Sequence, residues 1–360
     1  MRNDQAKYLL LLLAKLFLMN ISTFIQKAPK AELHNHIDGG IRVQTAIDLA
    51  LKHKVNLPSY DYDTLSAILT NDESCQSLIE YFKPFEYTIS ILQTEESLER
   101  VMYEYLEDAA KDQIRYIEAR FSPALHLKGG LSLSQVMEAV IKGKKQAEQD
   151  FNIKSNLIIC GLRQNSVHEN MELAQLAVSY KNKGVTAFDL AGEELGRPAK
   201  NHIKAFEIAI KNNLSRTVHA GEADGAHSIA DAIHYLGAQR IGHGTHLFED
   251  KDLLNYIIDK QIGLEVCLTS NMQTKSVKNI SKHPIKSYFD QDIAVTINTD
   301  STLISGTTLS NEYQLAHQLF DFDKDDLKKI ILNSFEQAFI PYDEKQDLIN
   351  AIKLELRQLC

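Results

Sequence analysis

The sequence predicts an α/β protein built as a (β/α)8 barrel of the TIM type, and three observations lead to this fold class. Short runs rich in β-branched residues alternate with longer stretches of helical periodicity along most of the 360-residue chain, a pattern typical of parallel sheets with helical crossovers. Eight such runs occur, and eight strand–helix units in this length fit a closed barrel better than an open sheet. No glycine-rich dinucleotide loop follows the first run, which disfavours an open doubly wound sheet.

The expected strands are short and apolar, and they cover residues 31–36, 114–121, 154–162, 185–190, 215–219, 239–242, 263–268 and 293–298. The expected helices between them show a 3.6-residue periodicity and cover residues 134–151, 169–181, 199–212, 228–236 and 251–260. Residues 58–113 form a long excursion after the first strand. We expect this excursion to be a helical insertion that caps the C-terminal face of the barrel.

A single barrel domain is expected over residues 29–350, with an N-terminal extension over 1–28 and a C-terminal tail over 351–360. The extension holds an apolar run at 8–19 that Lys15 interrupts, and a membrane-spanning helix needs about 20 apolar residues. We interpret residues 1–18 as an upstream artefact before a true start at Met19, or as a non-catalytic helix. A signal-peptide core is the alternative, although Asp4 dilutes its positive end.

Composition narrows the expected partners. The formal net charge is −9 and no block of lysine or arginine occurs, so neither a nucleic acid nor an anionic membrane is expected. Four cysteines lack the spacing of a disulfide framework or a zinc knuckle, which indicates a reducing, cytoplasmic setting: Cys75, Cys160, Cys267 and Cys360. A small molecule is therefore the expected partner, and nothing in the sequence sets the oligomeric state.

Metal-competent side chains fall where several expected strands end. His34 and His36 lie two residues apart, so on one strand both imidazoles point to the same face. Later strands end at or just before His219, His243 and Asp300. Because the C-terminal strand ends of a (β/α)8 barrel share one face, we expect these residues to converge there.

Three imidazoles and one carboxylate form a suitable shell for Zn²⁺ with an open position for water, whose pKa the ion lowers toward about 7. A glutamate such as Glu222 can then act as general acid toward a basic nitrogen. The strand at 185–190 is followed by Ala191 and Gly192 instead of the lysine used by two-metal barrels, so we expect one metal ion per chain.

Each of these residues also has an ordinary interpretation. His219 fits a core histidine, Asp300 a helix N-cap, and Glu222 a solvated loop carboxylate. His243 fits a turn residue between two glycines. The other histidines show no comparable arrangement and are interpreted as surface or packing residues: His53, His126, His168, His202, His227, His234, His246, His283 and His317.

As a set, these segments resemble the adenosine deaminase family of metal-dependent amidohydrolases. The resemblance covers about residues 29–350 and rests on AELHNHIDGG (31–40), FDLAGEE (188–194), TVHAGE (217–222), RIGHGTH (240–246), CLTSN (267–271) and INTD (297–300). It implies a cytoplasmic hydrolase of purine metabolism and salvage that converts adenosine and 2′-deoxyadenosine to inosine-type products and ammonia. The smaller His/Cys-zinc deaminases are excluded because their H-x-E and P-C-x-x-C signature is missing.

The resemblance also implies a role for each matching residue. The zinc ligands would be His34, His36, His219 and Asp300. Glu222 would donate a proton to purine N1, and His243 would orient the zinc-bound hydroxide that attacks C6.

On the substrate side, the resemblance implies a backbone donor to purine N3 at Gly192 and a carboxylate for the ribose 5′-hydroxyl at Asp38, with His36 beside them. In the excursion, an apolar gate over the nucleoside is expected from Tyr81, Phe82 and Phe85, which share one helical face. Ordinary packing onto the barrel is the alternative for each of the three.

One position departs from the family pattern. Many members carry a second aspartate after the last strand, which shares a proton with purine N7, whereas this chain has Ser301 after Asp300. A hydroxyl makes one hydrogen bond but supplies no charge. We expect Ser301 to contact N7 directly or through water, with activity kept but reduced.

Three alternatives remain open from the sequence. The nearest is another 6-aminopurine deaminase, acting on a 5′-modified adenosine, on adenine or on an N6-methylated nucleotide. Asp38 stands where adenine deaminases carry glutamate, which favours a nucleoside, and its charge would repel a 5′-phosphate. A catalytically silent nucleoside-binding relative and a two-metal hydrolase of esters or amides fit less well.

Overall fold

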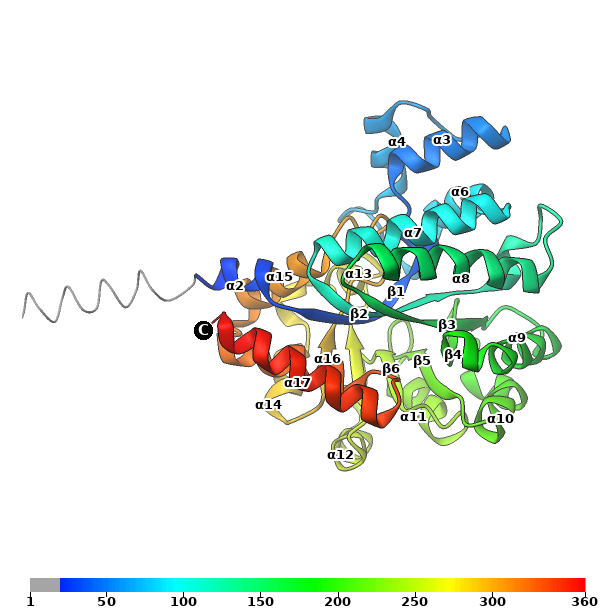
Figure 1. The fold of residues 1–360 in the computed structure, drawn as a ribbon. Helices are drawn as coiled ribbons and strands as arrows, with labels where there is room; N and C mark the ends of the chain where they lie inside the picture. Colours follow the sequence, from blue (N-terminus) through cyan, green and yellow to red (C-terminus); the bar gives the residue numbers. More distant parts are fainter. Residues whose placement is uncertain (1–19, 360) are drawn as a thin grey trace, which may run out of the picture.

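A computed structural model describes residues 20–359, and it has the predicted (β/α)8 architecture (Figure 1). All eight strands pair in parallel in sequence order. They are β1 (Lys30–His36), β2 (Ile114–Phe121), β3 (Lys154–Leu162), β4 (Val185–Ala191), β5 (Ser215–Ala220), β6 (Arg240–His243), β7 (Gly263–Val266) and β8 (Val295–Ile297). A parallel bridge between Asn35 and Asp300 joins the C-terminal ends of β1 and β8, so the sheet closes on the side of the expected site.

Helices surround this barrel on the outside (Figure 1). Those that follow β2 to β8 are α8 (Leu133–Asp150), α9 (Val167–Ser179), α10 (Ile203–Lys211), α11 (Ala226–His234), α12 (Lys251–Lys260), α13 (Leu268–Gln273), α14 (Ile285–Asp290), α15 (Leu309–Phe320) and α16 (Lys324–Gln337). The starts of α8 and α9 are fixed locally by capping boxes, Ser132 with Gln135 and Ser166 with Glu169.

Five helices lie between β1 and β2: α3 (Val43–His53), α4 (Tyr62–Leu69), α5 (Leu78–Tyr81), α6 (Lys83–Ile91) and α7 (Glu95–Lys111). In Figure 1, α3 and α4 project above the barrel, whereas α7 runs beside α8 along its wall. The excursion is therefore helical, as expected, but its helices begin at residue 43 instead of 58.

Both flanks of the expected domain take part in the core. In the expected extension, α2 (Ile21–Lys27) buries Phe24 and Ile25. The last helix, α17 (Tyr342–Gln358), continues past residue 350 and buries Ile352 and Leu356. The interpretations of residues 1–18 and of Cys360 lie outside the described residues.

The base of the barrel, where the strands begin, is closed by the linker between α16 and α17. The ring of Phe339 stacks on the guanidinium of Arg240 at 3.6 Å, and its backbone N–H donates to Glu118 at 2.5 Å. Arg240 also donates to Glu118 at 2.5 Å and to the carbonyl oxygen of Gln337 at 2.7 Å. Glu118 and Arg240 are fully buried, so two opposite charges are paired beneath the core.

The three cysteines in the described part of the chain are buried free thiols: Cys75, Cys160 and Cys267. Between residues 20 and 359, no helix combines the length and the apolar character that crossing a bilayer requires.

Candidate active site

Four metal-competent side chains meet at the C-terminal mouth of the barrel. One ligand atom from each of His34, His36, His219 and Asp300 lies within 4.8 Å of the others. The Nε2 atoms of His36 and His219 are 3.2 Å apart, and Asp300 Oδ1 lies 3.4 Å from His34 Nε2. His34 Nε2 is buried and has no hydrogen-bond partner. Converging imidazole nitrogens, one of them unsatisfied, beside a carboxylate fit a transition-metal ion.

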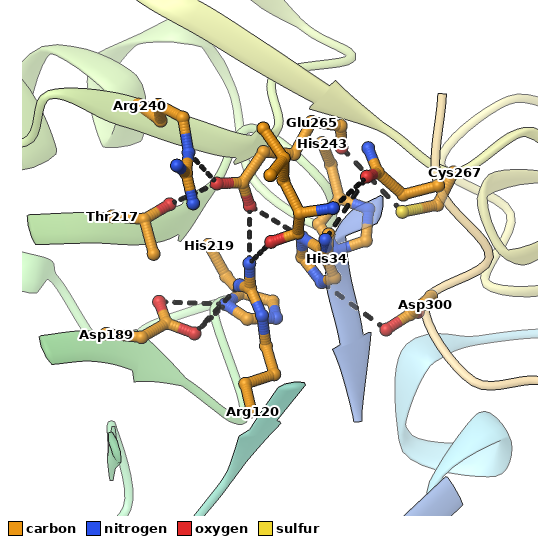
Figure 2. A network of polar contacts seen from close by, with 12 residues as sticks. His34, Arg120, Asp189, Thr217, His219, Arg240, His243, Glu265, Cys267 and Asp300 are labelled. Carbon is orange, nitrogen blue, oxygen red and sulfur yellow. Dashed lines mark hydrogen bonds and ion pairs between the residues drawn. The ribbon is translucent and has the colours of Figure 1, made fainter. Parts of the chain in front are cut away.

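Two of the histidines are oriented from behind by carboxylates, as Figure 2 shows. His34 Nδ1 lies 2.9 Å from Glu265 Oε2, and His219 Nδ1 lies 3.0 Å from Asp189 Oδ2. A carboxylate accepts from a protonated Nδ1, so each Nε2 keeps its lone pair toward the centre of the site. Arg120 donates to both carboxylates, at 2.8 Å to Glu265 and 3.0 Å to Asp189. One guanidinium therefore ties the two histidine supports together.

A chain of hydrogen bonds fixes the tautomer of His243. The backbone N–H of Ile285 donates to His283 Nδ1 at 3.1 Å, which leaves the proton of His283 on Nε2. That Nε2–H donates to Asn271 Oδ1 at 3.1 Å, and Asn271 Nδ2 donates to His243 Nδ1 at 3.0 Å. His243 therefore carries its proton on Nε2, which lies 3.5 Å from Glu222 Oε2. This nitrogen is a donor aimed into the site.

Glu222 has the environment of a protonated acid. It follows β5 in a loop, is 4% exposed, and its Oε1 has no hydrogen-bond partner. Burial raises the pKa of Glu222 well above its usual value, and the negative charges of Asp300 and Glu194 raise it further. Burial also lowers the pKa of His243 well below its usual value, so this imidazole is held neutral.

Backbone conformation at the site is unusual for non-glycine residues. His243 has φ +63° and Asp300 has φ +66°, both in the left-handed region. Such conformations are concentrated at functional sites because they cost stability of order 1–3 kcal/mol unless surrounding contacts enforce them. Two backbone hydrogen bonds hold Asp300 in this conformation. Its N–H donates to His34 O at 3.1 Å, and its carbonyl oxygen accepts from His36 N–H at 2.7 Å.

A cavity of about 830 Å³ opens above these residues. Its walls include the predicted site residues His36, Asp38, Gly192, His219, Glu222, His243 and Asp300. Burial raises the pKa of Asp38 to about 7, and its Oδ1 has no partner. Gly192 has φ +92°, a conformation in which any residue with a side chain would be strained, and a Cβ there would lie 2.2 Å from Gln164 Oε1 unless that side chain moved.

Aromatic residues of the β1–β2 excursion cover the same cavity. Tyr81, Phe82 and Phe85, the candidate gate, all line it, although they come from two short helices, with the break at Phe82. Tyr81 is anchored by a 2.7 Å hydrogen bond to Ser305, and the Phe85 ring lies 6.4 Å from that of His36. Leu78, which sequence reasoning missed, lines the cavity one turn earlier.

Ser301 lies beside the site but is not one of the residues that line the cavity. It is fully buried and its Oγ has no hydrogen-bond partner. A Cβ at Gly39 would lie 2.4 Å from that oxygen, so the hydroxyl packs against the backbone of the turn after β1. The contact of Ser301 with purine N7 stays a prediction.

The sequence analysis did not identify the residues that orient the candidate site side chains through hydrogen bonds. Arg120 lies in a strand with two further charged residues, and Glu265 lies in the short apolar strand β7. A charge inside a buried strand is the available signal, because buried charges require partners. Asn271 lies in one of the recognised segments without an assigned role. His283, interpreted as a surface or packing residue, is buried and bonded to Asn271.

A three-histidine, one-aspartate donor set at the mouth of a (β/α)8 barrel defines the class of protein, a metal-dependent barrel enzyme. The family model described as adenosine deaminase matches residues 29–354. This chain belongs to the adenosine deaminase family.

Individual relatives agree with this membership. A probable adenosine deaminase from Dictyostelium discoideum is 44% identical over 316 residues, which are 88% of this chain but only 41% of that protein. An adenosine deaminase from Clostridium kluyveri is 42% identical over 345 residues, covering 93% of this chain and 99% of the relative. The solved N6-methyl-AMP deaminase from Arabidopsis thaliana is 27% identical with a TM-score of 0.81, covering 92% of this chain and 98% of that one.

Proposed function

We propose that this protein hydrolyses adenosine and 2′-deoxyadenosine to inosine or 2′-deoxyinosine and ammonia, with one Zn²⁺ per chain. The observation that carries the proposal is that a donor set of His34, His36, His219 and Asp300 shares Asp300 with a second cluster, which adds Glu222 and His243. His34 Nε2 and Glu222 Oε1 are both buried and both without hydrogen-bond partners. Relatives at 42–44% identity named as adenosine deaminases support the same reaction.

The metal would be held by His34, His36, His219 and Asp300. Burial lowers the pKa of His36 and of His219, which keeps their nitrogen lone pairs available as ligands. When bound, zinc lowers the pKa of a water ligand toward about 7 and so supplies hydroxide at neutral pH.

Glu222 would donate its proton to purine N1. A raised pKa keeps this carboxyl protonated near neutral pH, and the unsatisfied Oε1 leaves an atom free for substrate. A proton on N1 withdraws electrons from C6 and makes it more electrophilic toward attack by oxygen.

His243 would act as a hydrogen-bond donor to the attacking oxygen. Its Nε2 carries the proton because Asn271 donates to its Nδ1, and burial keeps the ring neutral. The residue would therefore orient the attacking oxygen and stabilise the negative charge that it carries, while keeping its own proton.

The nucleoside would lie in the cavity with its sugar toward Asp38 and purine N3 toward the backbone N–H of Gly192. The buried oxygen of Asp38 would accept a hydrogen bond from the 5′-hydroxyl and would stay unpaired with a ligand that lacks this group, which disfavours free adenine. Ser301 would contact N7 directly or through water, and Tyr81, Phe82 and Phe85 would cover the ligand.

The test is adenosine conversion, followed by ultraviolet absorbance, with zinc-loaded protein and its Glu222→Gln variant. We expect rapid conversion by the parent and a kcat lower by about 10²–10⁴-fold in the variant, the range of general acid catalysis. Both proteins should bind one equivalent of zinc. Glu172→Gln, on the exposed face of α9, is the matched control and should leave kcat unchanged. Intact adenosine with zinc bound would overturn the substrate assignment.

A second candidate is a 6-aminopurine nucleoside with an added group, such as an N6-methylated nucleotide. The supporting observation is that Lys83 and Lys128 also line the cavity, where a cation can meet a 5′-phosphate. The Asp38 carboxyl opposes this ligand when it is ionised. Comparing kcat/KM for N6-methyl-AMP and adenosine in the same preparation decides between them.

A further inference from the structure

Glu194 is a buried carboxylate that binds the loop carrying Glu222. It follows β4, is 2% exposed, and accepts hydrogen bonds from four successive backbone N–H groups. The donors are Gly221 at 2.6 Å, Glu222 at 2.9 Å, Ala223 at 2.6 Å and Asp224 at 3.2 Å. The hydroxyl of Ser228 adds a fifth bond at 2.6 Å.

This pattern fixes the loop more tightly than a surface turn. The five bonds are shared by both oxygens, with Gly221 and Ser228 on Oε1 and the remaining three amides on Oε2. Four N–H groups point inward only if the chain curls around the carboxylate, and Gly221 supplies a φ of +70° at the start of that curl. Hydrogen bonds to an ionised acceptor are roughly twice as strong as neutral ones.

The same segment is bound from its other side. Arg163, after β3, donates from Nη2 to the carbonyl oxygen of His219 at 2.7 Å and from Nη1 to the carbonyl oxygen of Arg197. Residues 219–224 are therefore fixed by a guanidinium at their first carbonyl and by a carboxylate along their last four amides. Glu193, the residue before Glu194, does not bind this loop: it is more exposed and pairs with Arg197.

We propose that Glu194 is a positioning residue for the reaction, which acts through the backbone of residues 221–224 to hold the Glu222 carboxyl toward the cavity. This inference rests on the proposed function for its kinetic consequence. The placement of the loop does not depend on that function.

The kinetic test is a double-mutant cycle with Glu194→Gln and Glu222→Gln. Glutamine keeps the shape of the side chain but places an NH₂ group, which is a donor, against backbone N–H donors, so part of the loop loses its acceptor. We expect kcat for adenosine to fall by about 100-fold in Glu194→Gln, the effect of displacing a catalytic group by about 1 Å, with KM and zinc stoichiometry little changed. In the Glu222→Gln background the second substitution should lower kcat less than about 3-fold, because both act through one group. Effects that multiply would overturn the inference.

A second measurement does not require turnover. Amide hydrogen exchange of peptides covering 219–228 should be at least about 10-fold faster in Glu194→Gln than in the parent. The matched control is Glu148→Gln, because Glu148 accepts from the N–H and hydroxyl of Ser155 far from the site. That variant should speed exchange at residue 155 only and keep the parent kcat.

The two measurements separate the possible failures. If the parent leaves adenosine intact, the proposed function fails, and exchange at 221–224 still decides whether Glu194 holds the loop. Unchanged exchange in Glu194→Gln overturns the inference whatever the substrate is. Should that variant not fold, Ser228→Ala removes one donor and keeps the carboxylate. We expect it to shift kcat and exchange in the same direction by a smaller factor, and no shift in either would overturn the inference.

Discussion

The two ends of the barrel bury titratable groups in opposite ways. At the base, Glu118 and Arg240 are fully buried and bond to each other and to the linker around Phe339. At the mouth, Asp38 and Glu222 are also buried, yet each keeps an oxygen without a hydrogen-bond partner. An unsatisfied buried polar group costs about 1–3 kcal/mol. Burial of a carboxyl group therefore does not by itself mark function here; the carboxyls of Asp38 and Glu222 differ because each has an unsatisfied oxygen and lines the cavity.

One residue connects the two ends. Glu265 accepts from Arg240 at 2.6 Å on the base side and lies 2.9 Å from His34 on the mouth side (Figure 2). Thr217 donates a further bond to it at 2.9 Å. The carboxylate that orients His34, a candidate metal ligand, is thus also bonded to the paired charges that stabilise the base.

The largest expected effect is at the mouth. Asp300→Ala removes one candidate metal ligand, and we expect kcat for adenosine to fall by about 10⁴-fold, about 5 kcal/mol in the barrier. The free energy of unfolding of the metal-free protein should fall by only about 1 kcal/mol, because a single hydroxyl, that of Ser270, loses its acceptor. Urea unfolding, zinc stoichiometry and kcat measured together check this. A large loss of stability with activity retained would reverse the comparison.

The base should show the opposite behaviour. Glu118→Gln leaves Arg240 with a weaker partner in a dry environment, and we expect the free energy of unfolding to fall by about 3 kcal/mol. The folded protein should keep its zinc and its kcat, since no atom of Glu118 reaches the site. Thermal unfolding with and without zinc measures the first effect, and initial rates at low temperature measure the second. A variant as stable as the parent but inactive would contradict this prediction.

His126 tests whether a buried titratable group at the mouth of the barrel contributes to stability when its hydrogen bonds are made. It lies at the mouth end of β2, but its Nδ1 bonds to the carbonyl oxygen of Leu92 at 2.9 Å, and burial lowers its pKa to about 4. The unfolded chain binds a proton below about pH 6.5 and the folded chain does not. This residue's contribution to stability is therefore complete above pH 6.5 and declines toward pH 4, by about 1.4 kcal/mol per unit.

Replacing this imidazole with an amide isolates the effect. His126→Asn cannot titrate, so the difference in unfolding free energy between the parent and the variant should shrink as the pH falls from 6.5 to 4. Chemical denaturation at several pH values measures it. A constant difference would show that the group titrates normally in the folded protein.

The smallest effect is expected at Ser301. Ser301→Asp adds a carboxyl group beside the site, and we expect kcat/KM for adenosine to rise by about 3-fold through a proton shared between this carboxyl and purine N7. Stability should fall slightly, because Ser301 already packs closely on Gly39. Steady-state kinetics decides the matter, and an unchanged or lower kcat/KM would count against a direct role at N7.

Much of the fold follows from local pattern. The eight strands lie within a few residues of the runs that predict them, because β-branched stretches between helical segments are a local signal. The convergence of His34, His219 and Asp300 needed only the rule that C-terminal strand ends share a face.

The supporting contacts follow no such pattern. His243 depends on Asn271 and His283, and Glu222 depends on Glu194, through bonds between separate loops. Loop–loop hydrogen bonds leave no periodicity in the sequence. The break at Phe82 has a local cause that the aromatic spacing hides: Pro84 lacks a backbone N–H, so it cannot continue the first helix and instead lies in the first turn of the second.

Closure of the base by Phe339 has a consequence for biosynthesis. Because chains fold from the N-terminal end as they are made, the strands holding Glu118 and Arg240 leave the ribosome long before the linker that satisfies them. The base of the barrel is therefore closed last, by residues near the C-terminus of the chain. A chain released early lacks the linker that closes the base. A nascent chain that stops before residue 339 should be recognised by chaperones and proteases as unfinished, although all four candidate metal ligands have already been translated.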